Sequence, residues 1–169
     1  MSYLKVKRNE ESDTDFYYRN EKLIGIVNGD GSEQWFDERG KLHREGDLPA
    51  QVDEDGSTHW YNHGKLHREN DLPAVILEDG TGGKFWYIHG KLHRENDLPA
   101  YIDGYGEQSW YKDGLKHREN DLPAHIDDDK NSFWYKNGKL HRDGGFPAVE
   151  YVDGKQEWWE NGVKIEKQL

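Results

Sequence analysis

The stretch Lys65-Leu66-His67-Arg68-Glu69-Asn70-Asp71-Leu72-Pro73-Ala74 decides the fold, because it recurs along the chain. It returns nearly unchanged at residues 91–100 and 115–124, and in looser form at 41–50 and 139–148. A glycine precedes each copy and opens a last unit, at intervals of 24, 26, 24, 24 and 24 residues: Gly40, Gly64, Gly90, Gly114, Gly138 and Gly162. A fixed period of about 20–50 residues indicates a repeat array in which each unit covers the apolar face of its neighbour.

Each unit contains three segments typical of β-strands, separated by turns. In the second unit they are residues 74–77, 85–87 and 91–94, with Asp79-Gly80 and His89-Gly90 between them. Asn-Gly and Asp-Gly pairs in such places indicate hairpins, because both central residues of a type I′ turn need positive φ. Glycine and proline at this density disfavour helix. The sequence therefore predicts an all-β, elongated solenoid of β-hairpins with about five main repeats of 24–26 residues and degenerate caps.

The repeats are expected to form one domain over residues 1–169. Residues 1–39 would be an N-terminal cap with a degenerate repeat, residues 40–161 the main repeats, and residues 162–169 a C-terminal cap. In one unit Leu115-Lys116 reverses the usual Lys-Leu order. Leu115 should therefore point where lysine normally points, unless the strand slips by one residue.

Side chains alternate between faces along a strand, which sorts the repeated residues. The face shared by alanine and Val/Ile in the Pro-Ala-x-(Val/Ile) runs should be buried: Ala50, Val52, Ala74, Ile76, Ala100, Ile102, Ala124 and Ile126. One tryptophan per unit holds an equivalent position: Trp35, Trp60, Trp86, Trp110, Trp134 and Trp158. An aromatic residue follows each of them on the opposite face. We expect one aromatic ladder to pack inside and the other to line a surface.

The composition limits the classes of partner. The formal net charge is −11, which makes unassisted binding to DNA, RNA or anionic lipid unfavourable and favours a basic or neutral partner, although acidity also serves solubility alone. Seven Trp, ten Tyr and five Phe argue against disorder. The absence of cysteine excludes disulfides and thiolate chemistry. Without an apolar signal core or a span of about 20 apolar residues, the chain is expected to be cytoplasmic and to make no membrane contact.

The spacing Tyr-x-x-Gly-x-x-His occurs in four units, which begin at Tyr61, Tyr87, Tyr111 and Tyr135. It resembles the aromatic-x-x-Gly-x-x-His centre of MORN repeats, which are stacked β-hairpins about 23 residues long. The resemblance covers roughly residues 17–165 and is to a divergent variety, with Gly-Lys-Leu-His-Arg and Pro-Ala, found in phages, large DNA viruses and bacteria. It implies a binding or scaffolding module. Arginine stands where a glycine usually follows the histidine, which, with the acidic charge, argues against the lipid binding suggested for some MORN proteins.

The repeated His-Arg-Glu-Asn-Asp cluster could be interpreted as acid–base sets, but catalytic sites are singular whereas this cluster returns in nearly every unit. We therefore predict no enzyme and no catalytic residue. The histidines are expected to form a structural ladder bonded to carboxylates or loop carbonyls: His43, His67, His93, His117 and His141. Equivalent histidines would lie about 10–14 Å apart, too far to share an ion, so no metal and no cofactor is predicted.

The function predicted from these features is non-catalytic binding of another protein, with no direct nucleic-acid contact and with the oligomeric state open. An inhibitor of a host enzyme or an antitoxin-like factor, acting in a bacterial cell if a phage encodes it, would suit such a chain. The contact candidates are the outer aromatic residues and the loop acids: Phe36, Tyr61, Tyr87, Tyr111, Tyr135, Trp159, Glu45, Glu69, Glu95 and Glu119.

Two alternatives stay open. The repeated arginines could hold a nucleotide-like ligand, so that the protein acts as a sponge for it: Arg44, Arg68, Arg94, Arg118 and Arg142. The acids after them, Glu45, Glu69, Glu95, Glu119 and Asp143, could instead imitate DNA phosphates, although each adjacent arginine would weaken that field.

Overall fold

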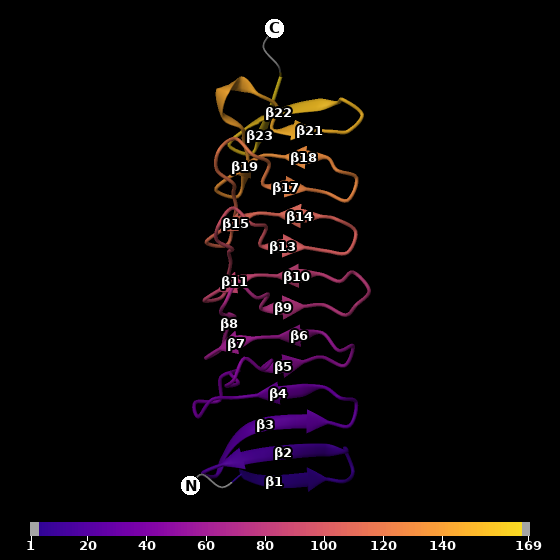
Figure 1. Cartoon of the computed structure of the whole chain (residues 1–169), viewed down its shortest axis with the longest axis vertical. Helices are drawn as coiled ribbons and strands as arrows, with labels where there is room; N and C mark the ends of the chain where they lie inside the picture. The colour runs from indigo at the N-terminus through magenta and orange to yellow at the C-terminus, as the bar shows by residue number, and fades with distance from the viewer. Residues whose placement is uncertain (1–3, 167–169) are drawn as a thin grey trace.

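The computed structural model describes residues 4–166 and shows an elongated rod built almost entirely from short antiparallel strands (Figure 1). The predicted all-β hairpin solenoid is confirmed. The ends of the two predicted caps, residues 1–3 and 167–169, lie outside the described part of the chain.

One sheet of 15 strands runs the length of the rod, and its strands follow the chain order. Its first four strands are β1 (Leu4–Asn9), β2 (Thr14–Arg19), β3 (Lys22–Asn28) and β4 (Glu33–Trp35). Each later repeat then adds two strands: β5 (Gln51–Val52) and β6 (Thr58–His59), β9 (Val75–Ile76) and β10 (Lys84–Phe85), β13 (Tyr101–Ile102) and β14 (Gln108–Ser109), β17 (His125–Ile126) and β18 (Ser132–Phe133), β21 (Val149–Glu150) and β22 (Gln156–Glu160), and finally β23 (Val163–Ile165). The sheet is therefore a meander whose length grows by two strands per repeat.

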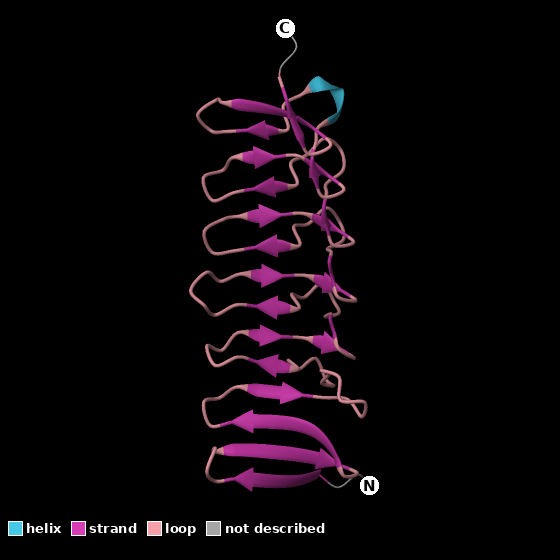
Figure 2. Ribbon diagram, turned by 180° about the vertical axis from the view of Figure 1, so that it is seen from behind, coloured by secondary structure: helices cyan, strands magenta, loops and turns pink. Residues whose placement is uncertain are grey.

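A column of two-stranded hairpins stands beside one end of this sheet (Figure 2). The hairpins are β7 (Tyr61–Asn62) with β8 (Lys65–Leu66), β11 (Tyr87–Ile88) with β12 (Lys91–Leu92), β15 (Tyr111–Lys112) with β16 (Leu115–Lys116), and β19 (Tyr135–Lys136) with β20 (Lys139–Leu140). In the first unit a single bridge between Phe36 and Leu42 takes this place. A short 3₁₀ turn, Asp143–Gly145, is the helical element of the described residues.

In the four middle repeats the tryptophan is the corner between the long sheet and the side hairpin: Trp60, Trp86, Trp110 and Trp134. The Trp86 N–H donates to Ala100 O (2.8 Å) in the next repeat, while Trp86 O accepts from His93 N–H (3.0 Å) in its own side hairpin. The prediction of one continuous aromatic strand over residues 85–87 was therefore wrong, because the chain turns from one sheet to the other at Trp86. The strand predicted over residues 91–94 likewise ends at Leu92.

The core is thin and lies at this corner. The alanine of each Pro-Ala pair is 0% exposed, and Trp60, Trp86, Trp110 and Trp134 are 6–9% exposed. Their burial confirms the predicted inner face for alanine and an inner tryptophan ladder. The Val/Ile residues of that face are only half-buried, so the predicted burial of that face holds for its alanines alone. Trp35 and Trp158, at the two ends of the ladder, are also half-buried.

The two turns of each repeat differ in type. In the side hairpins both central residues have positive φ, as at His89 (50°) and Gly90 (85°), which confirms the predicted type I′ geometry. At the far edge of the long sheet only the glycine does: Gly56 has φ 88° and its N–H donates to Asp53 O (3.0 Å). This turn and the turn at Gly154 are three-residue loops closed by a left-handed glycine, so the type I′ prediction was wrong there. The outer turn between Leu77 and Gly83 is a longer loop, and in the loop 127–131 Lys130 (φ 69°) holds the left-handed position.

Side-hairpin glycines also join neighbouring repeats. The Gly90 N–H donates to Leu66 O in the preceding repeat (2.8 Å), and the same bond recurs at Gly64, Gly114, Gly138 and Gly162. We expect Gly90→Ala to lower the free energy of unfolding by about 1–2 kcal/mol, because the left-handed backbone conformation disfavours a Cβ, although space for one exists 3.6 Å from the Lys65 Cβ. The urea midpoint measures this effect. His89→Asn is the control and should stay within about 0.5 kcal/mol, since asparagine tolerates positive φ; an equal loss in both variants would contradict the argument.

The reversed pair Leu115-Lys116 does not shift the register. Tyr111 pairs with Lys116 and Lys112 with Leu115, as Tyr87 and Ile88 pair with Leu92 and Lys91. Leu115 is therefore exposed where lysine usually stands, and Lys116 lies half-buried, where burial lowers the pKa of its amine and Glu107 partly offsets this.

Both ends depart from the repeat. At the N-terminal end, β1, β2 and β3 form a plain meander, and Glu21 (φ 64°) holds the left-handed turn position that glycine holds elsewhere. At the C-terminal end, β22 runs unbroken through Trp158 and pairs with both β21 and β23. The C-terminal departure from the repeat therefore begins at β22, before the predicted boundary at residue 162.

Candidate functional site

Four of the five repeated arginines are held from three sides. The Arg94 guanidinium lies 3.9 Å above the centre of the Trp86 ring, and its Nη1 donates to Pro99 O (3.3 Å). Its Nε and Nη2 donate to the two carboxylate oxygens of Asp71 in the preceding repeat, both at 2.8 Å. The same arrangement holds Arg68 on Asp47, Arg118 on Asp97 and Arg142 on Asp121. These four arginines are only 13–15% exposed.

These arginines lower the pKa of the aspartates chiefly through the hydrogen bonds: Asp47, Asp71, Asp97 and Asp121. A second tight turn places each carboxylate. Asn70 and Asp71 both have positive φ (61° and 55°), and Leu72 N–H donates to Glu69 O (3.3 Å), which is type I′ geometry. Asp71 O then accepts from Trp86 Nε1 (2.9 Å). The sequence reasoning missed this turn, although Asn-Asp tolerates the left-handed region and could have indicated it.

The histidine ladder is also used within the rod. His93 Nε2 lies 3.1 Å from Glu95, and its Nδ1 accepts from the Asp113 N–H of the next repeat (3.1 Å). An acceptor at Nδ1 requires the neutral tautomer with its proton on Nε2. His67, His117 and His141 are placed in the same way, which agrees with the predicted structural role.

The loops between side hairpins and sheet expose a regular row of side chains, here called the loop row. Its carboxylates are 63–90% exposed: Glu45, Glu69, Glu95, Glu119 and Asp143. Its apolar members, three residues after each acid, are 38–56% exposed: Leu48, Leu72, Leu98, Leu122 and Phe146. The four glutamates were among the predicted protein contacts, and Asp143 was named only for DNA mimicry. The apolar members were missed, because the repeated phrase was interpreted by its charged residues.

The predicted aromatic contacts are less accessible than the loop row. Phe36, Tyr61, Tyr87, Tyr111, Tyr135 and Trp159 are all half-buried. Burial is the largest cause that raises the pKa of the four tyrosine hydroxyls. Of the two sets of predicted contacts, the acids are therefore exposed and the aromatic residues are half-buried.

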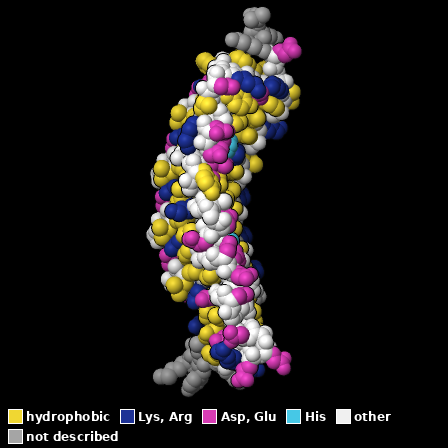
Figure 3. All heavy atoms as spheres, turned by 90° about the vertical axis from the view of Figure 1, so that its right-hand side faces the viewer, with side chains coloured by type: hydrophobic (Ala, Val, Ile, Leu, Met, Phe, Trp, Pro, Cys, Tyr) yellow, Lys and Arg dark blue, Asp and Glu magenta, His cyan; other side chains and the backbone are white. Residues whose placement is uncertain are grey.

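A second acidic surface lies on the edge formed by the outer turns of the long sheet. Figure 3 faces this edge and shows carboxylates along the length of the rod. Its exposed members are Asp30, Glu54, Asp55, Glu78, Asp79, Asp128, Asp129 and Asp153. Several are tied to their own turns, as Asp79 is to Thr81 N–H (2.9 Å).

One irregular polar cluster contains a serine, a histidine and a glutamate. Ser109 Oγ lies 2.8 Å from His125 Nδ1, and Glu107 approaches the same nitrogen at 3.7 Å. A proton relay needs the hydroxyl and the carboxylate on opposite ring nitrogens, and Ser109 is 1% exposed. The cluster therefore lacks a nucleophile's geometry. Residues 4–166 contain no group of three or more His, Asp or Glu side chains placed to hold a metal ion.

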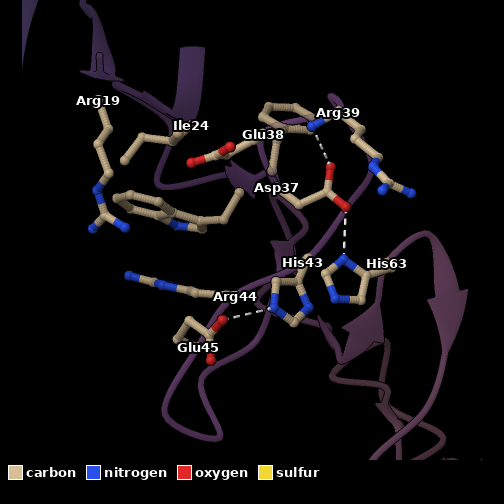
Figure 4. Close-up of a pocket in the computed structure, with 11 residues that line it drawn as sticks. Arg19, Ile24, Asp37, Glu38, Arg39, His43, Arg44, Glu45 and His63 are labelled. Atoms are coloured by element: carbon tan, nitrogen blue, oxygen red, sulfur yellow. Dashed lines mark hydrogen bonds and ion pairs between the residues drawn. The ribbon is translucent and has the colours of Figure 1, made fainter. Parts of the chain in front are cut away.

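A pocket of about 820 Å³ lies where the N-terminal meander meets the first regular repeat, and is here called the end pocket. Its main lining residues are Arg19, Trp35, Phe36, Asp37, Arg44 and His63. Asp37 accepts from His63 Nδ1 (2.7 Å), which is the largest cause that lowers the pKa of Asp37 to about 2 (Figure 4). The His43 ring stacks on His63 with centroids 4.1 Å apart, and its buried Nδ1 has no hydrogen-bond partner within residues 4–166.

Comparison with known protein families and with curated proteins finds no match to this chain. Within the described residues there is no helix with the length and apolar character needed to cross a membrane.

Proposed function

We propose that this chain is a non-catalytic binding protein whose loop row contacts another protein. The observation that carries the proposal is the repetition of one exposed apolar side chain and one exposed carboxylate per repeat, at equivalent positions in five successive loops. A contiguous exposed apolar patch indicates an interaction surface, and we propose that the five apolar side chains, repeated along one line of the rod, act together as such a surface.

The spacing and charge of the loop row define the partner. Each repeat adds two strands to the long sheet, so equivalent side chains recur about every 10 Å. A partner that presents apolar side chains flanked by basic side chains at a similar spacing would match the apolar and the acidic members of the loop row at once. The chain's net charge of −11 would speed the encounter with such a surface.

The two alternatives find less support in the geometry. Four of the five arginines considered for a nucleotide-like ligand already bind an aspartate through Nε and Nη2 and stack on a tryptophan ring. These donors are therefore not open to a phosphate. For DNA mimicry, the loop row supplies about one charge per 10 Å, whereas duplex DNA carries one per about 1.7 Å of its axis. Protein binding is therefore the function we favour.

The biological setting we propose follows from the resemblance to the MORN variety of phages, large DNA viruses and bacteria. A small acidic rod that presents one contact surface could block the basic surface of an enzyme. An inhibitor or an antitoxin-like factor within a bacterial cell is the role that combines this setting with the loop row.

The test is capture from lysate of the native host, with the purified protein as bait at low and moderate salt. The wild type should capture one protein stoichiometrically, and salt should weaken the capture because the row's acids are exposed. The triple variant Leu72→Ser, Leu98→Ser, Leu122→Ser should lose it. The control replaces three exposed side-hairpin lysines, Lys65→Ser, Lys91→Ser and Lys139→Ser, and should retain it. Equal capture by all three baits, each confirmed folded by circular dichroism, would refute the loop row as the contact.

A further inference from the structure

We infer that the end pocket is a binding site for a carboxylate, with Arg44 as the residue that receives it. The end pocket shares Glu45 with the loop row but none of the apolar members that carry the proposed function, so the inference does not depend on that function. It starts from a comparison between repeats of the same chain. All five equivalent arginines lie over a tryptophan ring and donate to a proline carbonyl, but Arg44 lacks the aspartate that the other four hold. Arg44 and Arg142 each have a glutamate on Nη1 in addition.

Arg44 is placed as the other four arginines are. Its guanidinium lies 4.1 Å above the Trp35 ring centre, and its Nη1 donates to Pro49 O (3.2 Å). In the next four repeats Nε and Nη2 of the equivalent arginine bind both oxygens of an aspartate from the preceding tight turn, which is Gly46-Asp47 for Arg68 and an Asn-Asp pair for the other three. The N-terminal meander has no such turn, and Nε and Nη2 of Arg44 have no hydrogen-bond partner among the described residues.

Glu33 replaces only part of the missing aspartate. A single oxygen, Oε2, accepts from Trp35 Nε1 (2.7 Å) and from Arg44 Nη1 (3.0 Å). It therefore accepts the indole N–H that the main-chain carbonyl of the aspartate accepts in other repeats. It also gives Arg44 one charge-assisted hydrogen bond. The two parallel donors that elsewhere receive a planar carboxylate stay open.

The pocket around these donors adds a second cation. Figure 4 shows the guanidinium groups of Arg19 and Arg44 at the same end of the site, away from Arg39. Arg19 is exposed and forms no ion pair with the described residues. The pocket volume of about 820 Å³ lies within the usual range of about 300–1,000 Å³ for ligand sites.

The chemistry selects a carboxylate over a phosphate. A guanidinium binds a planar carboxylate through two parallel bonds, and this chain repeats that pairing four times. Glu33 and the loop-row acid Glu45 lie beside the site, and the whole chain is acidic. A dianionic phosphate would meet more repulsion there than a monoanionic carboxylate. The carboxylate could come from an aspartate in a polypeptide turn or from a small free acid.

The test is a titration followed by the NMR signals of the Arg44 Nε–H and the Trp35 indole N–H. The probes are the peptide Glu-Asn-Asp-Leu-Pro-Ala, which is the chain's own turn at residues 69–74, the same peptide with Asn in place of Asp, acetate, and inorganic phosphate. Both signals should move saturably with a carboxylate probe. The peptide that has lost its aspartate should bind more weakly than its parent.

Variants make the result specific. Arg44→Ala should weaken binding at least about tenfold, as read from the Trp35 signal, whereas Arg39→Ala, at the far end of the pocket, should leave it unchanged. Glu33→Gln should strengthen binding severalfold because it removes the competing charge, and this gain guards against misreading a local unfolding of Arg44→Ala. Selective response to the peptide over acetate would identify a polypeptide source, and an equal response a small acid. Tighter binding of phosphate, no shift with any carboxylate, or no gain in Glu33→Gln would overturn the inference.

Discussion

Replacing Trp110 with alanine should lower the free energy of unfolding by about 3–5 kcal/mol, the usual cost of removing a large buried aromatic side chain. Trp110 is 6% exposed, its Nε1 donates to Asp97 O (3.0 Å), and the Arg118 guanidinium lies 3.9 Å above its ring. The substitution therefore removes the filling of the corner and the surface on which the arginine rests. Urea unfolding followed by circular dichroism measures the loss.

The matched control is Trp35→Ala, at the end of the same ladder. Trp35 is half-buried and bonds Glu33 instead of a turn from a preceding repeat, so its loss should cost less. Because contacts in a solenoid are made only between neighbours, Trp110→Ala should also broaden the transition by weakening the middle of the array. Equal, small losses in both variants would show that the tryptophan corner does not hold the rod together.

The period, the strand content and the side-hairpin turns could be predicted because they depend on local backbone chemistry. His89-Gly90 and Asn137-Gly138 suit a type I′ turn whatever surrounds them. The division of each aromatic segment at Trp86 could not be predicted, because it depends on which carbonyl of the next repeat receives its N–H. The half-burial of Ile76 likewise depends on what the stacked repeats place over that face, which the alternation along one strand does not specify.

The candidate site was predictable in part for the same reason. The exposure of Glu69 follows from a charged residue in a loop, and the structural use of the histidines follows from their repetition. The partner of Arg94 is Asp71, 23 residues earlier, and this pairing appears only when the repeats are stacked. The C-terminal end agrees with this pairing between repeats. Gly145 stands where the other repeats have the aspartate, and its carbonyl accepts from the Trp158 indole N–H. No repeated arginine follows Arg142 in the sequence, so no aspartate is needed there. The empty donors of Arg44 are visible only by comparison with these filled positions.

Acidification should destabilise the rod, beginning near pH 4. The Arg118 hydrogen bonds lower the pKa of Asp97 in the folded state, and Asp47, Asp71 and Asp121 are affected in the same way. In the unfolded chain these groups return to about 3.9. The unfolded state therefore binds more protons in this range, so the stabilisation is complete above the unfolded pKa and is lost as the pH falls through the folded one. Asp37, with a folded pKa of about 2, extends the window downward.

The measurement is the urea midpoint of the wild type and of Asp97→Asn between pH 7 and pH 2. At pH 7 the variant should be less stable, because Arg118 keeps a weaker, uncharged acceptor. As the pH falls below about 4 the gap should narrow, since the wild-type carboxylate takes up its proton as the pH falls through its lowered folded pKa. Glu54→Gln is the control, because Glu54 is exposed and makes no ion pair within the described residues, and it should follow the wild type throughout. A gap between wild type and Asp97→Asn that stayed constant down to pH 2 would contradict this account.

The expected loss is specific to the boundaries between repeats. Each aspartate belongs to one repeat and its arginine to the next, so protonation weakens the contact between units while the hydrogen bonds inside each hairpin remain. The aspartates are about half exposed, so solvent screens each pair and the effect depends on their sum along the array. The loop row that we propose as the contact surface keeps its regular spacing only while these boundaries hold. Partner binding should therefore decline over the same acidic range in which the midpoint falls.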